Sequence, residues 1–411
     1  MPDIADPPSD AALTVIGIGA DGSLDGAAEA LVRDAEVVLG GRRHLAAVPV
    51  MPGQERLAWP TPLAEHLPSL LERVRGRRTV ALASGDPMVS GIGTTLVRAL
   101  GAAAVRIIPS ISSAALARAR MGWSAEESVV VGLVGRHESR LVREIAPGRR
   151  ILLLTSGAET PAIVGALLVG AGCGDVAVTL LGDLGSAHET RARRTAREWV
   201  AVPAADVPPL HVLAVEIPAS ISDWHSTWVA GLPDDAFDHD GQLTKRDLRA
   251  SALARLRPAP GQHLWDVGAG AGSVGIEWMR AHPTCHTTAV ESDPDRAARI
   301  AHNAARLGVP DLVVVEGHAP DALAHLPRPD AVFIGGGATR PGVLDTCLAA
   351  LALGGRLVVH GVTLETEALL AESYRTHGGE LTRIAVESVA PVGNFTGWTP
   401  ARTVTQWALT R

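Results

Sequence analysis

A run of glycines at two-residue spacing, in the second half of the sequence, is of a type that could bind a cofactor. The run Asp266-Val267-Gly268-Ala269-Gly270-Ala271-Gly272-Ser273 follows an apolar segment and precedes a helical pattern. Glycine lets a ligand approach the backbone, and the first amides of a helix are free to donate hydrogen bonds. Glu291 follows Gly270 by 21 residues, and its carboxylate could accept from two neighbouring hydroxyls. The pattern predicts a cofactor-binding loop at the end of a strand.

The spacing of these glycines separates two kinds of cofactor. A dinucleotide-binding loop reads Gly-x-Gly-x-x-Gly, but here the third glycine is Gly272 and serine follows it. The Gly-x-Gly-x-Gly loop resembles motif one of the Rossmann-like S-adenosylmethionine methyltransferases. That resemblance implies cofactor contacts from Asp266, Gly268, Gly270, Gly272 and Glu291. Binding of a nicotinamide cofactor is the alternative.

Three more segments, over about residues 240 to 411, resemble the decarboxylating precorrin methyltransferases. They are Gln242-Leu243-Thr244-Lys245-Arg246-Asp247-Leu248-Arg249-Ala250, then Glu316-Gly317-His318-Ala319-Pro320, then Asp330-Ala331-Val332-Phe333-Ile334-Gly335-Gly336-Gly337. The resemblance implies catalytic roles for Thr244 and Lys245, cofactor contacts at Gly317 and Ala319, and substrate contacts at Gly335 and Gly336. His318 stands where such families usually carry an acid, so we expect nearby backbone amides to hold the adenine.

The N-terminal half carries a different set of glycine and serine turns. They are Gly17-Ile18-Gly19-Ala20-Asp21-Gly22, Ala83-Ser84-Gly85-Asp86-Pro87-Met88, Gly91-Ile92-Gly93 and Pro109-Ser110-Ile111-Ser112-Ser113-Ala114. Together they resemble the tetrapyrrole methylase superfamily, although the first loop lacks the usual proline. In that superfamily the cofactor lies folded between two α/β lobes. The resemblance implies cofactor contacts from Gly17, Gly19, Gly85, Asp86, Met88, Ser112 and Ser113.

Arginines near these turns are candidates for binding carboxylates. Arg42, Arg43 and His44 follow a strand that ends in Gly40-Gly41, and the arginine fork suits the acetate and propionate arms of a tetrapyrrole. We therefore predict that Arg42 and Arg43 bind substrate. Asp86 has an alternative role as the cap of its own turn. Arg191, Arg193, Arg194 and Arg197 are interpreted as a solvated helix face.

Both halves in this order resemble the fused methyltransferases of cobalamin biosynthesis. The resemblance implies two S-adenosylmethionine sites, one per domain, and methylation of a precorrin at carbons 5 and 15 with decarboxylation of the ring C acetate. An RNA methyltransferase and a non-catalytic S-adenosylmethionine-binding protein are the alternatives. Lys245 is the only lysine of the chain, so it is either functional or a surface residue retained by chance. By analogy we expect a homo-oligomer.

Composition limits the class of protein. The 411 residues carry 37 basic and 44 acidic side chains, a net charge of -7 that argues against a nucleic-acid partner. Three distant cysteines build neither disulfides nor a metal knuckle, and Pro283 interrupts the only tempting ligand set, His282, Cys285 and His286. We expect no metal. The polar start and the lack of a long uncharged apolar run predict a cytoplasmic protein without membrane contact.

The elements that position these motifs follow from the alternation of apolar runs and helical patterns. We expect a two-lobed α/β domain over residues 11–217 with a largely parallel sheet, a linker over 218–240, and a doubly wound Rossmann-like α/β domain over 241–411. The strands expected in the first domain are 13–18, 37–39, 79–83, 105–108, 129–133, 151–154, 176–181 and 210–217. Those expected in the second are 263–267, 287–291, 312–316, 331–334 and 356–360.

Overall fold

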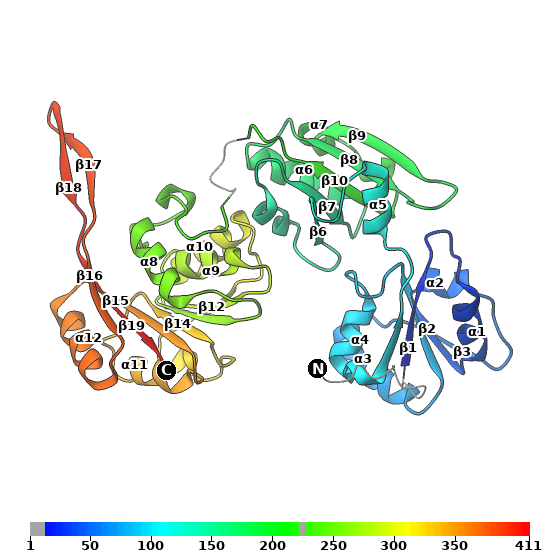
Figure 1. The fold of residues 1–411 in the computed structure, drawn as a ribbon, viewed down its shortest axis with the longest axis horizontal. Helices are drawn as coiled ribbons and strands as arrows, with labels where there is room; N and C mark the ends of the chain where they lie inside the picture. Colours follow the sequence, from blue (N-terminus) through cyan, green and yellow to red (C-terminus); the bar gives the residue numbers. More distant parts are fainter. Residues whose placement is uncertain (1–12, 222–226) are drawn as a thin grey trace. The chain divides into compact units, whose positions relative to one another are not determined.

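The computed structural model describes residues 13–221 and 227–411, and the chain forms two compact units (Figure 1). The first unit runs to Arg136 and resumes over Gly148–Pro218. The second comprises His137–Pro147 and Ala219–Arg411. The first two residues of the predicted domain 11–217 and residues 222–226 of the predicted linker lie outside the described residues. No described helix is both long and apolar enough to span a membrane.

The first unit begins with a five-stranded sheet in which every pair is parallel, in the order β3-β2-β4-β1-β5. Helices α3 and α4 pack on one face and α1 on the other, so the apolar strands are buried on both sides. The strands are β1 (Leu13–Ile18), β2 (Val37–Gly40), β3 (Glu55–Ala58), β4 (Thr79–Ser84) and β5 (Val105–Ile108), and the helices are α1 (Gly26–Asp34), α2 (Arg42–Ala47), α3 (Leu63–Val74) and α4 (Ile92–Leu100).

A second sheet forms the other lobe of this unit, in the order β6-β7-β10-β8-β9. Only the β6 and β7 pair is parallel, whereas β7, β10, β8 and β9 pair antiparallel. The expectation of a largely parallel sheet is therefore wrong for this lobe. Its elements are α5 (Ser113–Met121), β6 (Ser128–Gly132), β7 (Arg150–Leu154), α6 (Thr160–Gly170), β8 (Ala177–Gly182), β9 (Thr190–Thr195), α7 (Ala196–Val200) and β10 (His211–Glu216).

The basic run of the first unit corrects another expectation. Arg191, Arg193 and Arg194 lie on the edge strand β9, and only Arg197 is helical. Arg193 pairs with Glu216 at 3.2 Å, and the Arg194 guanidinium lies 5.5 Å from the centre of the Trp199 ring. Charged side chains on an edge strand discourage pairing with another chain. The run is exposed as predicted, but it protects a sheet edge and does not form a helix face.

The second unit contains a seven-stranded sheet in the order β13-β12-β11-β14-β15-β19-β16. The first five strands of that order are parallel, and β19 is antiparallel to both of its neighbours. Helices α8 to α10 cover one face and α11 and α12 the other, which is the predicted doubly wound arrangement. The elements are α8 (Arg246–Leu256), β11 (His263–Val267), α9 (Ser273–Ala281), β12 (His286–Glu291), α10 (Pro294–Arg306), β13 (Val313–Glu316), β14 (Ala331–Ile334), α11 (Val343–Ala350), β15 (Arg356–Gly361), α12 (Leu364–His377), β16 (Glu380–Ile384) and β19 (Val404–Thr410).

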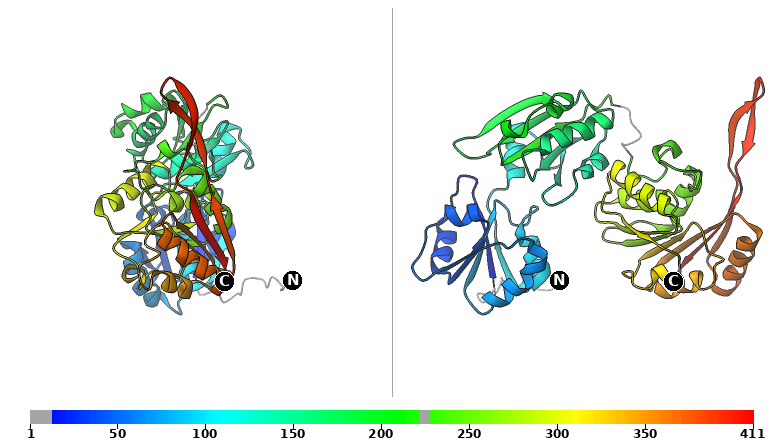
Figure 2. Two further views of the ribbon diagram at one scale, coloured as in Figure 1. Left: turned by 90° about the vertical axis from the view of Figure 1, so that its left-hand side faces the viewer. Right: turned by 180° about the vertical axis from the view of Figure 1, so that it is seen from behind.

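A hairpin of β17 (Glu387–Val392) and β18 (Phe395–Pro400) extends from this sheet, and Figures 1 and 2 show it standing away from the rest of the unit. The two strands pair only with each other. They carry one charged residue, Glu387, whereas Phe395 and Trp398 are 80% and 69% exposed. The hairpin was absent from the predicted elements because it lacks a core face of its own.

The region predicted as a linker is instead largely part of the second core. Leu232, Ala236 and Phe237 are buried with residues of α8 and α9, so the prediction is wrong over the described residues from Leu232 onward. The Glu277 carboxylate accepts from the backbone amides of Gly231 and Leu232, both at 2.8 Å. Asp and Pro residues broke the local periodicity here, but the few apolar side chains between them pack inward.

A short segment from the N-terminal half also belongs to the second unit. The 3-10 helix Glu138–Glu144 packs on α10, and Arg140 pairs with Asp311. Arg143 donates to the carbonyl of Arg280 at 3.1 Å, and the Trp228 indole donates to the carbonyl of Arg143 at 2.9 Å. The predicted domain 11–217 is therefore interrupted, because these bonds place its residues 137–147 on the second core.

One buried ion pair joins the pieces of the second unit. Arg249 is fully buried and donates through Nε to Glu277 at 2.8 Å. Its other nitrogens donate to the carbonyl of Thr244 at 2.5 Å, to the carbonyl of Leu232, and to Asp234 at 3.3 Å. The guanidinium also lies 4.7 Å from the centre of the Phe237 ring. The pair thus links α8, α9 and the segment that precedes them.

We expect Arg249→Met to lower the free energy of unfolding of the second unit by about 3–5 kcal/mol, because the Glu277 carboxylate would remain buried without its cation. Urea unfolding followed by tryptophan fluorescence measures the change. Arg255→Met is the matched control, since Arg255 lies on the same helix and its pair with Glu380 is exposed. That control is expected to cost less than about 1 kcal/mol. Equal losses in both variants would contradict the role given to the buried pair.

Candidate functional site

The predicted glycine loop of the second unit lies where the strand order of its sheet reverses. β11 ends at Val267, and its neighbours β12 and β14 belong to the two halves of the strand order. A Cβ atom on Gly268 would stand 2.8 Å from the carbonyl oxygen of Gly336, and Gly268 has a φ of +67°. The predicted cofactor and substrate glycines therefore meet here, in backbone contact, at the crevice where doubly wound folds bind ligands.

Three side chains from other elements hold this loop. The Glu291 carboxylate accepts from the amide of Gly270 at 2.8 Å, and Asn303 donates to the carbonyl of Ala271 at 3.1 Å. Ile300 packs against Gly272, so that a Cβ there would stand 2.7 Å from the isoleucine side chain. Glu291 also accepts from the amides of Ser292 and Asp293. Those two amides donate to Oε1, whereas Oε2 accepts only from Gly270, so Oε2 can still accept from a hydroxyl.

Asp266 occupies a different position from the one that its predicted cofactor contact suggests. Its side chain is buried, and Oδ2 accepts from the amide of Gly275 in the first turn of α9 at 2.9 Å. Oδ1 has no hydrogen-bond partner. Burial raises the pKa of Asp266 to about 7, and the nearby Glu291 charge adds to the rise, while the Gly275 amide opposes it. Through its bond with the Gly275 amide, Asp266 holds the start of α9 against the strand that leads into the glycine loop.

The segment with Thr244 and Lys245 lies beside the glycine loop. A Cβ on Gly270 would stand 2.8 Å from the carbonyl oxygen of Gln242, so the two backbones are in close contact. Asp240 anchors the segment, because it pairs with Arg296 and Arg299 of α10, and these arginines lower the pKa of Asp240. Asn303, which holds the glycine loop, also bonds both the amide and the carbonyl of Asp238.

Lys245 itself is half-exposed at the start of α8. Its ammonium lies 3.6 Å from Asp234, which also accepts from the amide of Arg246 at 3.0 Å and from Arg249. Thr244 is partly buried, and its carbonyl accepts from Arg249. The Arg246 amide and the Arg249 guanidinium therefore hold Asp234, the ion-pair partner of Lys245.

Gly317 and Ala319, which are predicted to contact the cofactor, follow β13 at the same edge of the sheet. The Gly317 amide donates to the carbonyl of Glu291 at 2.9 Å, which joins the ends of β12 and β13. Gly317 has a φ of +156°, and Ala319 is partly buried beside it. His318 is exposed. Gly317, Glu291 and the glycine loop thus follow three adjacent strands.

The first unit contains a comparable close approach of backbones. A Cβ on Gly17 would overlap the carbonyl oxygen of Gly85 and would stand 2.6 Å from the amide of Ser110. The Gly85 amide donates to the carbonyl of Ile18 at 2.8 Å, and the Gly85 carbonyl accepts from Ser110. Three of the four predicted turns of this half therefore meet at the carboxyl ends of β4, β1 and β5, in that order across the sheet.

Several predicted cofactor residues of this half also hold local turns. Asp86 accepts from the amide of Met88 at 2.8 Å, which is the alternative role stated for it. Ser112 caps α5 by accepting from the amide of Ala115 at 3.1 Å, and Ser113 is the exposed first residue of that helix. Met88 is 45% exposed. Their backbones lie beside Gly85, whose own Cβ would stand 2.9 Å from Ser112 Cα.

Gly19 belongs to the turn after β1. Its amide donates to the carbonyl of Ser23 at 2.9 Å, and a Cβ on it would stand 2.7 Å from the Asp21 carboxylate. Asp21 in turn accepts from the amide and the hydroxyl of Ser23, which lower the pKa of the Asp21 carboxyl. The turn is therefore compact and closed by its own polar groups.

Arg43 connects the predicted substrate residues with the predicted cofactor turn. Its guanidinium donates to the hydroxyl of Ser84 at 2.8 Å, and Ser84 directly precedes Gly85. His44 Nε2 lies 2.8 Å from the same hydroxyl. Arg42, beside them, is exposed. Sequence reasoning missed Ser84 because no local pattern announces a contact between residues 40 positions apart.

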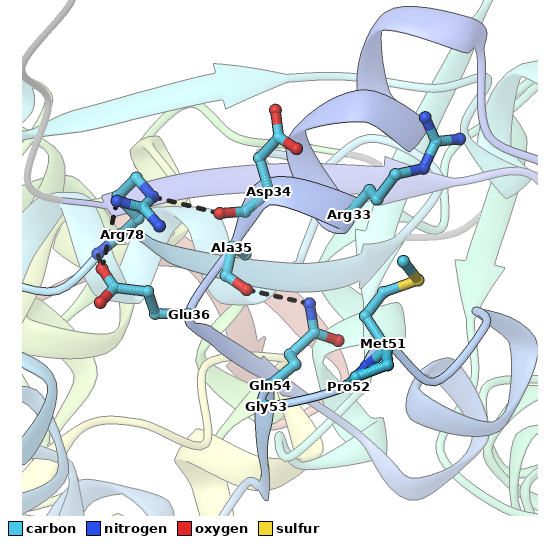
Figure 3. Close-up of a pocket in the computed structure, with 9 residues that line it drawn as sticks. All are labelled: Arg33, Asp34, Ala35, Glu36, Met51, Pro52, Gly53, Gln54 and Arg78. Carbon is cyan, nitrogen blue, oxygen red and sulfur yellow. Dashed lines mark hydrogen bonds and ion pairs between the residues drawn. The ribbon is translucent and has the colours of Figure 1, made fainter.

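Neither a metal site nor a second ligand site emerges at the other candidate positions. No group of three metal-ligating side chains occurs within residues 13–221 and 227–411. A hollow of the first unit, shown in Figure 3, lies at the amino ends of β2, β3 and β4, away from the glycine turns. Two of its side chains bind the backbone there: the Gln54 amide nitrogen donates to the carbonyl of Ala35, and Arg78 donates to that of Asp34.

The residues present fit a nucleotide-type methyl donor in both units. Backbone amides and carbonyls converge at positions where only glycine leaves room, and in the second unit the Glu291 carboxylate stands at the loop. Amides, carbonyls and one carboxylate are the groups that a ribose and an amino acid moiety require.

Comparisons with known proteins agree with this arrangement. A family model of tetrapyrrole (corrin/porphyrin) methylases matches residues 12–199, and one of a precorrin methyltransferase domain matches residues 235–411. The precorrin-6Y C(5,15)-methyltransferase [decarboxylating] of Sinorhizobium sp is 43% identical over 97% of this chain and 96% of its own. The chain belongs to this family.

Two further relatives have the same name. The enzyme of Mycobacterium tuberculosis is 42% identical over 97% of this chain and 100% of its own length. Among solved structures, the C-terminal domain of precorrin-6Y C5,15-methyltransferase from Rhodobacter capsulatus is 43% identical, with a TM-score of 0.43, and covers 45% of this chain and 100% of its own. Membership of the family confirms the resemblance stated from the motifs, including their order along the chain.

We expect the stability of the second unit to fall between about pH 4 and pH 7 through Asp266. Its pKa is raised on folding, so the folded state binds the proton more tightly than the unfolded chain, and that advantage is lost as the pH rises to about 7. The contribution amounts to up to about 4 kcal/mol. Asp266→Asn keeps an acceptor for Gly275 and removes the charge. Urea unfolding at several pH values should therefore give a flatter profile for the variant, and parallel profiles would contradict this prediction.

Proposed function

We propose that this chain methylates a precorrin macrocycle at carbons 5 and 15 and decarboxylates its ring C acetate, with S-adenosylmethionine as methyl donor. The observation that carries the proposal is a close contact of glycine backbones at the carboxyl edge of each of two sheets, Gly17 with Gly85 and Gly268 with Gly336. Each contact leaves room for a cofactor at the ends of the strands. The family relatives extend over 97% of the chain and have both carbon positions and the decarboxylation in their names. A single contact of this kind would support one methylation.

The first unit is proposed to methylate carbon 5 and the second to methylate carbon 15 with loss of carbon dioxide. A relative that matches only 37% of this chain supports the division, since this protein of Salmonella typhimurium is named cobalt-precorrin-6B C(15)-methyltransferase (decarboxylating). S-adenosylmethionine supplies an electrophilic methyl group when bound. A meso carbon of a reduced tetrapyrrole is nucleophilic in the manner of an enamine, so positioning and exclusion of water provide most of the catalysis.

Cations of this chain suit the carboxylate arms and the decarboxylation. Arg42 and Arg43 are exposed at the end of β2, and Arg43 reaches the cofactor turn through Ser84. In the second unit Lys245 follows by three residues Gln242, whose carbonyl contacts the glycine loop, and its ammonium lies 3.6 Å from Asp234. When carbon dioxide leaves, the electron pair of the broken bond enters the conjugated macrocycle. A cation that holds the macrocycle in the accepting form lowers the barrier.

The chain is further proposed to act in the cytoplasm as a homo-oligomer. All three cysteines are free and buried, which suits a reducing compartment. The hairpin β17 and β18 exposes Val389, Val392, Phe395 and Trp398 with no apolar face to cover them. A two-stranded hairpin of this kind is marginally stable in water unless another surface packs on it. A second copy of the chain is the partner that symmetric assembly supplies.

Two other functions are disfavoured by particular features. An RNA methyltransferase needs a basic surface with aromatic side chains for the bases, whereas on β9 Arg193 is paired with Glu216 and Arg194 lies over the Trp199 ring. A nicotinamide enzyme is disfavoured by the glycine spacing. Incubation of the intact chain with labelled S-adenosylmethionine and either a reduced precorrin or RNA tests the proposal. Two methyl groups and one carbon dioxide per macrocycle are expected, and label in RNA alone, or in neither, would refute it.

We expect each unit to bind one S-adenosylmethionine, so calorimetric titration of the intact chain should give about two sites. Glu291→Gln should weaken one of them by roughly tenfold or more, because it removes the charge at the second glycine loop and leaves the first unit unchanged. Asp295→Asn, an exposed change in the first turn of α10, is the control. A stoichiometry of one, with Glu291→Gln abolishing all binding, would defeat the proposal of separate sites.

We expect Lys245→Arg to lower carbon dioxide release and carbon 15 methylation by about tenfold or more, because a guanidinium cannot replace the compact ammonium at this position. Carbon 5 methylation and the melting temperature should stay nearly unchanged, since Lys245 is exposed and its pair with Asp234 is long. Arg246→Lys, at the next position, is the matched control. Carbon dioxide release at the wild-type rate would return Lys245 to the role of a surface residue.

A further inference from the structure

A cluster of three polar side chains lies at the carboxyl edge of the first sheet and is not explained by cofactor binding. Ser84, the last residue of β4, is exposed, and its hydroxyl lies 2.8 Å from both an Arg43 guanidinium nitrogen and His44 Nε2. The same Arg43 nitrogen lies 3.2 Å from His44 Nε2. Arg43 and His44 come from α2, so two adjacent strands, β2 and β4, bring the three groups together.

The protons of this cluster can be placed from the donors alone. A guanidinium only donates, so the His44 Nε2 that faces it must be the unprotonated nitrogen. Ser84 then accepts from Arg43 and donates its own proton to His44 Nε2. The Nδ1 nitrogen of His44 carries the ring proton and is buried without a hydrogen-bond partner. The cluster therefore consists of an oriented Ser84 hydroxyl that donates to the unprotonated Nε2 of His44.

The proposed reaction at carbon 5 requires a proton acceptor. A meso carbon carries one hydrogen, which must leave when a methyl group takes its place. We propose that Ser84 and His44 form the proton-accepting pair of carbon 5 methylation, with Ser84 passing the proton to His44 Nε2. This inference rests on the proposed function and adds to it two residues that belong to neither the predicted cofactor nor the predicted substrate set.

The step balances with the groups present. The new carbon–carbon bond uses the electron pair of the enamine-like meso carbon, and the pair of the broken methyl–sulfur bond stays on sulfur. The carbon 5–hydrogen bond then breaks, and its electron pair restores the conjugation of the macrocycle. Its proton goes to the Ser84 oxygen while the Ser84 hydroxyl proton moves to His44 Nε2. Because the methylated macrocycle is cationic before this loss, its carbon–hydrogen bond is acidic enough for a weak base.

The surroundings keep His44 available as a base. Burial, together with the charge of Arg43, lowers the pKa of His44 to about 4. Helix α2 packs on β2, β3 and β4, and the charged groups there are engaged elsewhere. Arg56 of β3 donates to the carbonyls of Leu45 and Val48, and Glu55 of β3 binds Arg73 and Arg77. Asp86, beyond β4, accepts from Met88. On α2 itself the positive charge of Arg43 opposes protonation of the ring.

The free protein provides a test that does not depend on activity. Nitrogen-15 NMR of the histidine rings, with the His44 signals assigned by their loss in His44→Gln, should show an unprotonated Nε2 and no titration above about pH 5. Arg43→Gln removes the neighbouring positive charge, so the titration should move to higher pH. A protonated Nε2 at neutral pH, or a titration that Arg43→Gln leaves in place, would overturn the inference.

Single-turnover methylation of carbon 5 tests the reaction itself. His44→Gln keeps an amide oxygen as acceptor near the Nε2 position but cannot take a proton, so the rate should fall by about 100-fold. Ser84→Ala should have a similar effect, and Ser84→Thr, which restores the hydroxyl, should recover most of the rate. S-adenosylmethionine binding and the melting temperature should remain close to wild type in each. His66→Gln, at an exposed position on α3, is the control.

The outcomes separate this inference from the proposed function. If the wild-type chain methylates carbon 5 and His44→Gln does so equally fast, the inference is wrong and the proposed function stands. A wild-type chain that adds no methyl group at carbon 5 would refute both. If His44→Gln lowers the melting temperature as well as the rate, the result would assign His44 a structural role only.

Discussion

The buried pair of Arg249 and Glu277 is the interaction on which the geometry of the second unit depends. A guanidinium and a carboxylate removed from water must each be fully hydrogen-bonded, and here the bonds join α8, α9 and the segment that precedes them. The pair therefore sets α8 against α9 and draws the segment around Leu232 into the core. Arg249 also binds Thr244 and Asp234, and Asp234 is the ion-pair partner of Lys245. The position of Lys245 therefore depends on the buried pair.

Both units solve the same problem by close approach of backbones. Adjacent parallel strands end at one edge of a sheet, and a ligand can reach their amides only where side chains are missing. In the first unit Gly17 fits between Gly85 and Ser110, and in the second Gly268 fits against Gly336. The two sheets have different strand orders, so the shared feature is the chemistry of the edge and not a common topology.

The polar residues around these edges divide by what they touch. Asp266, Asn303 and Ser112 bond to backbone amides or carbonyls and hold the loops in place. Arg43, Ser84 and Lys245 have polar atoms at the surface and are available to a substrate. The first group holds the protein backbone, and we propose that the second takes part in the reaction, although both kinds look alike as motif residues in the sequence.

The sequence by itself determined the strands that carry the sites and the identity of the cofactor loops. Apolar runs that end in glycine predicted β1, β11 and β14 with their observed bounds, because a strand buried on both faces and its terminating turn are both local properties. Glycine spacing likewise distinguished the methyltransferase loop from a dinucleotide loop. The hairpin of β17 and β18 was missed because its exposed strands have neither signal.

Only the tertiary structure decided which distant residues meet. The region around Phe237 read as a linker, since its polar neighbours hide three side chains that find a core elsewhere. The segment 137–147 belongs to the second unit, and the sheet of the second lobe is mostly antiparallel. The contact of His44 with Ser84 joins residues 40 positions apart. Such contacts depend on the strand order and on burial of apolar faces, and neither is encoded in the residues adjacent to the contact.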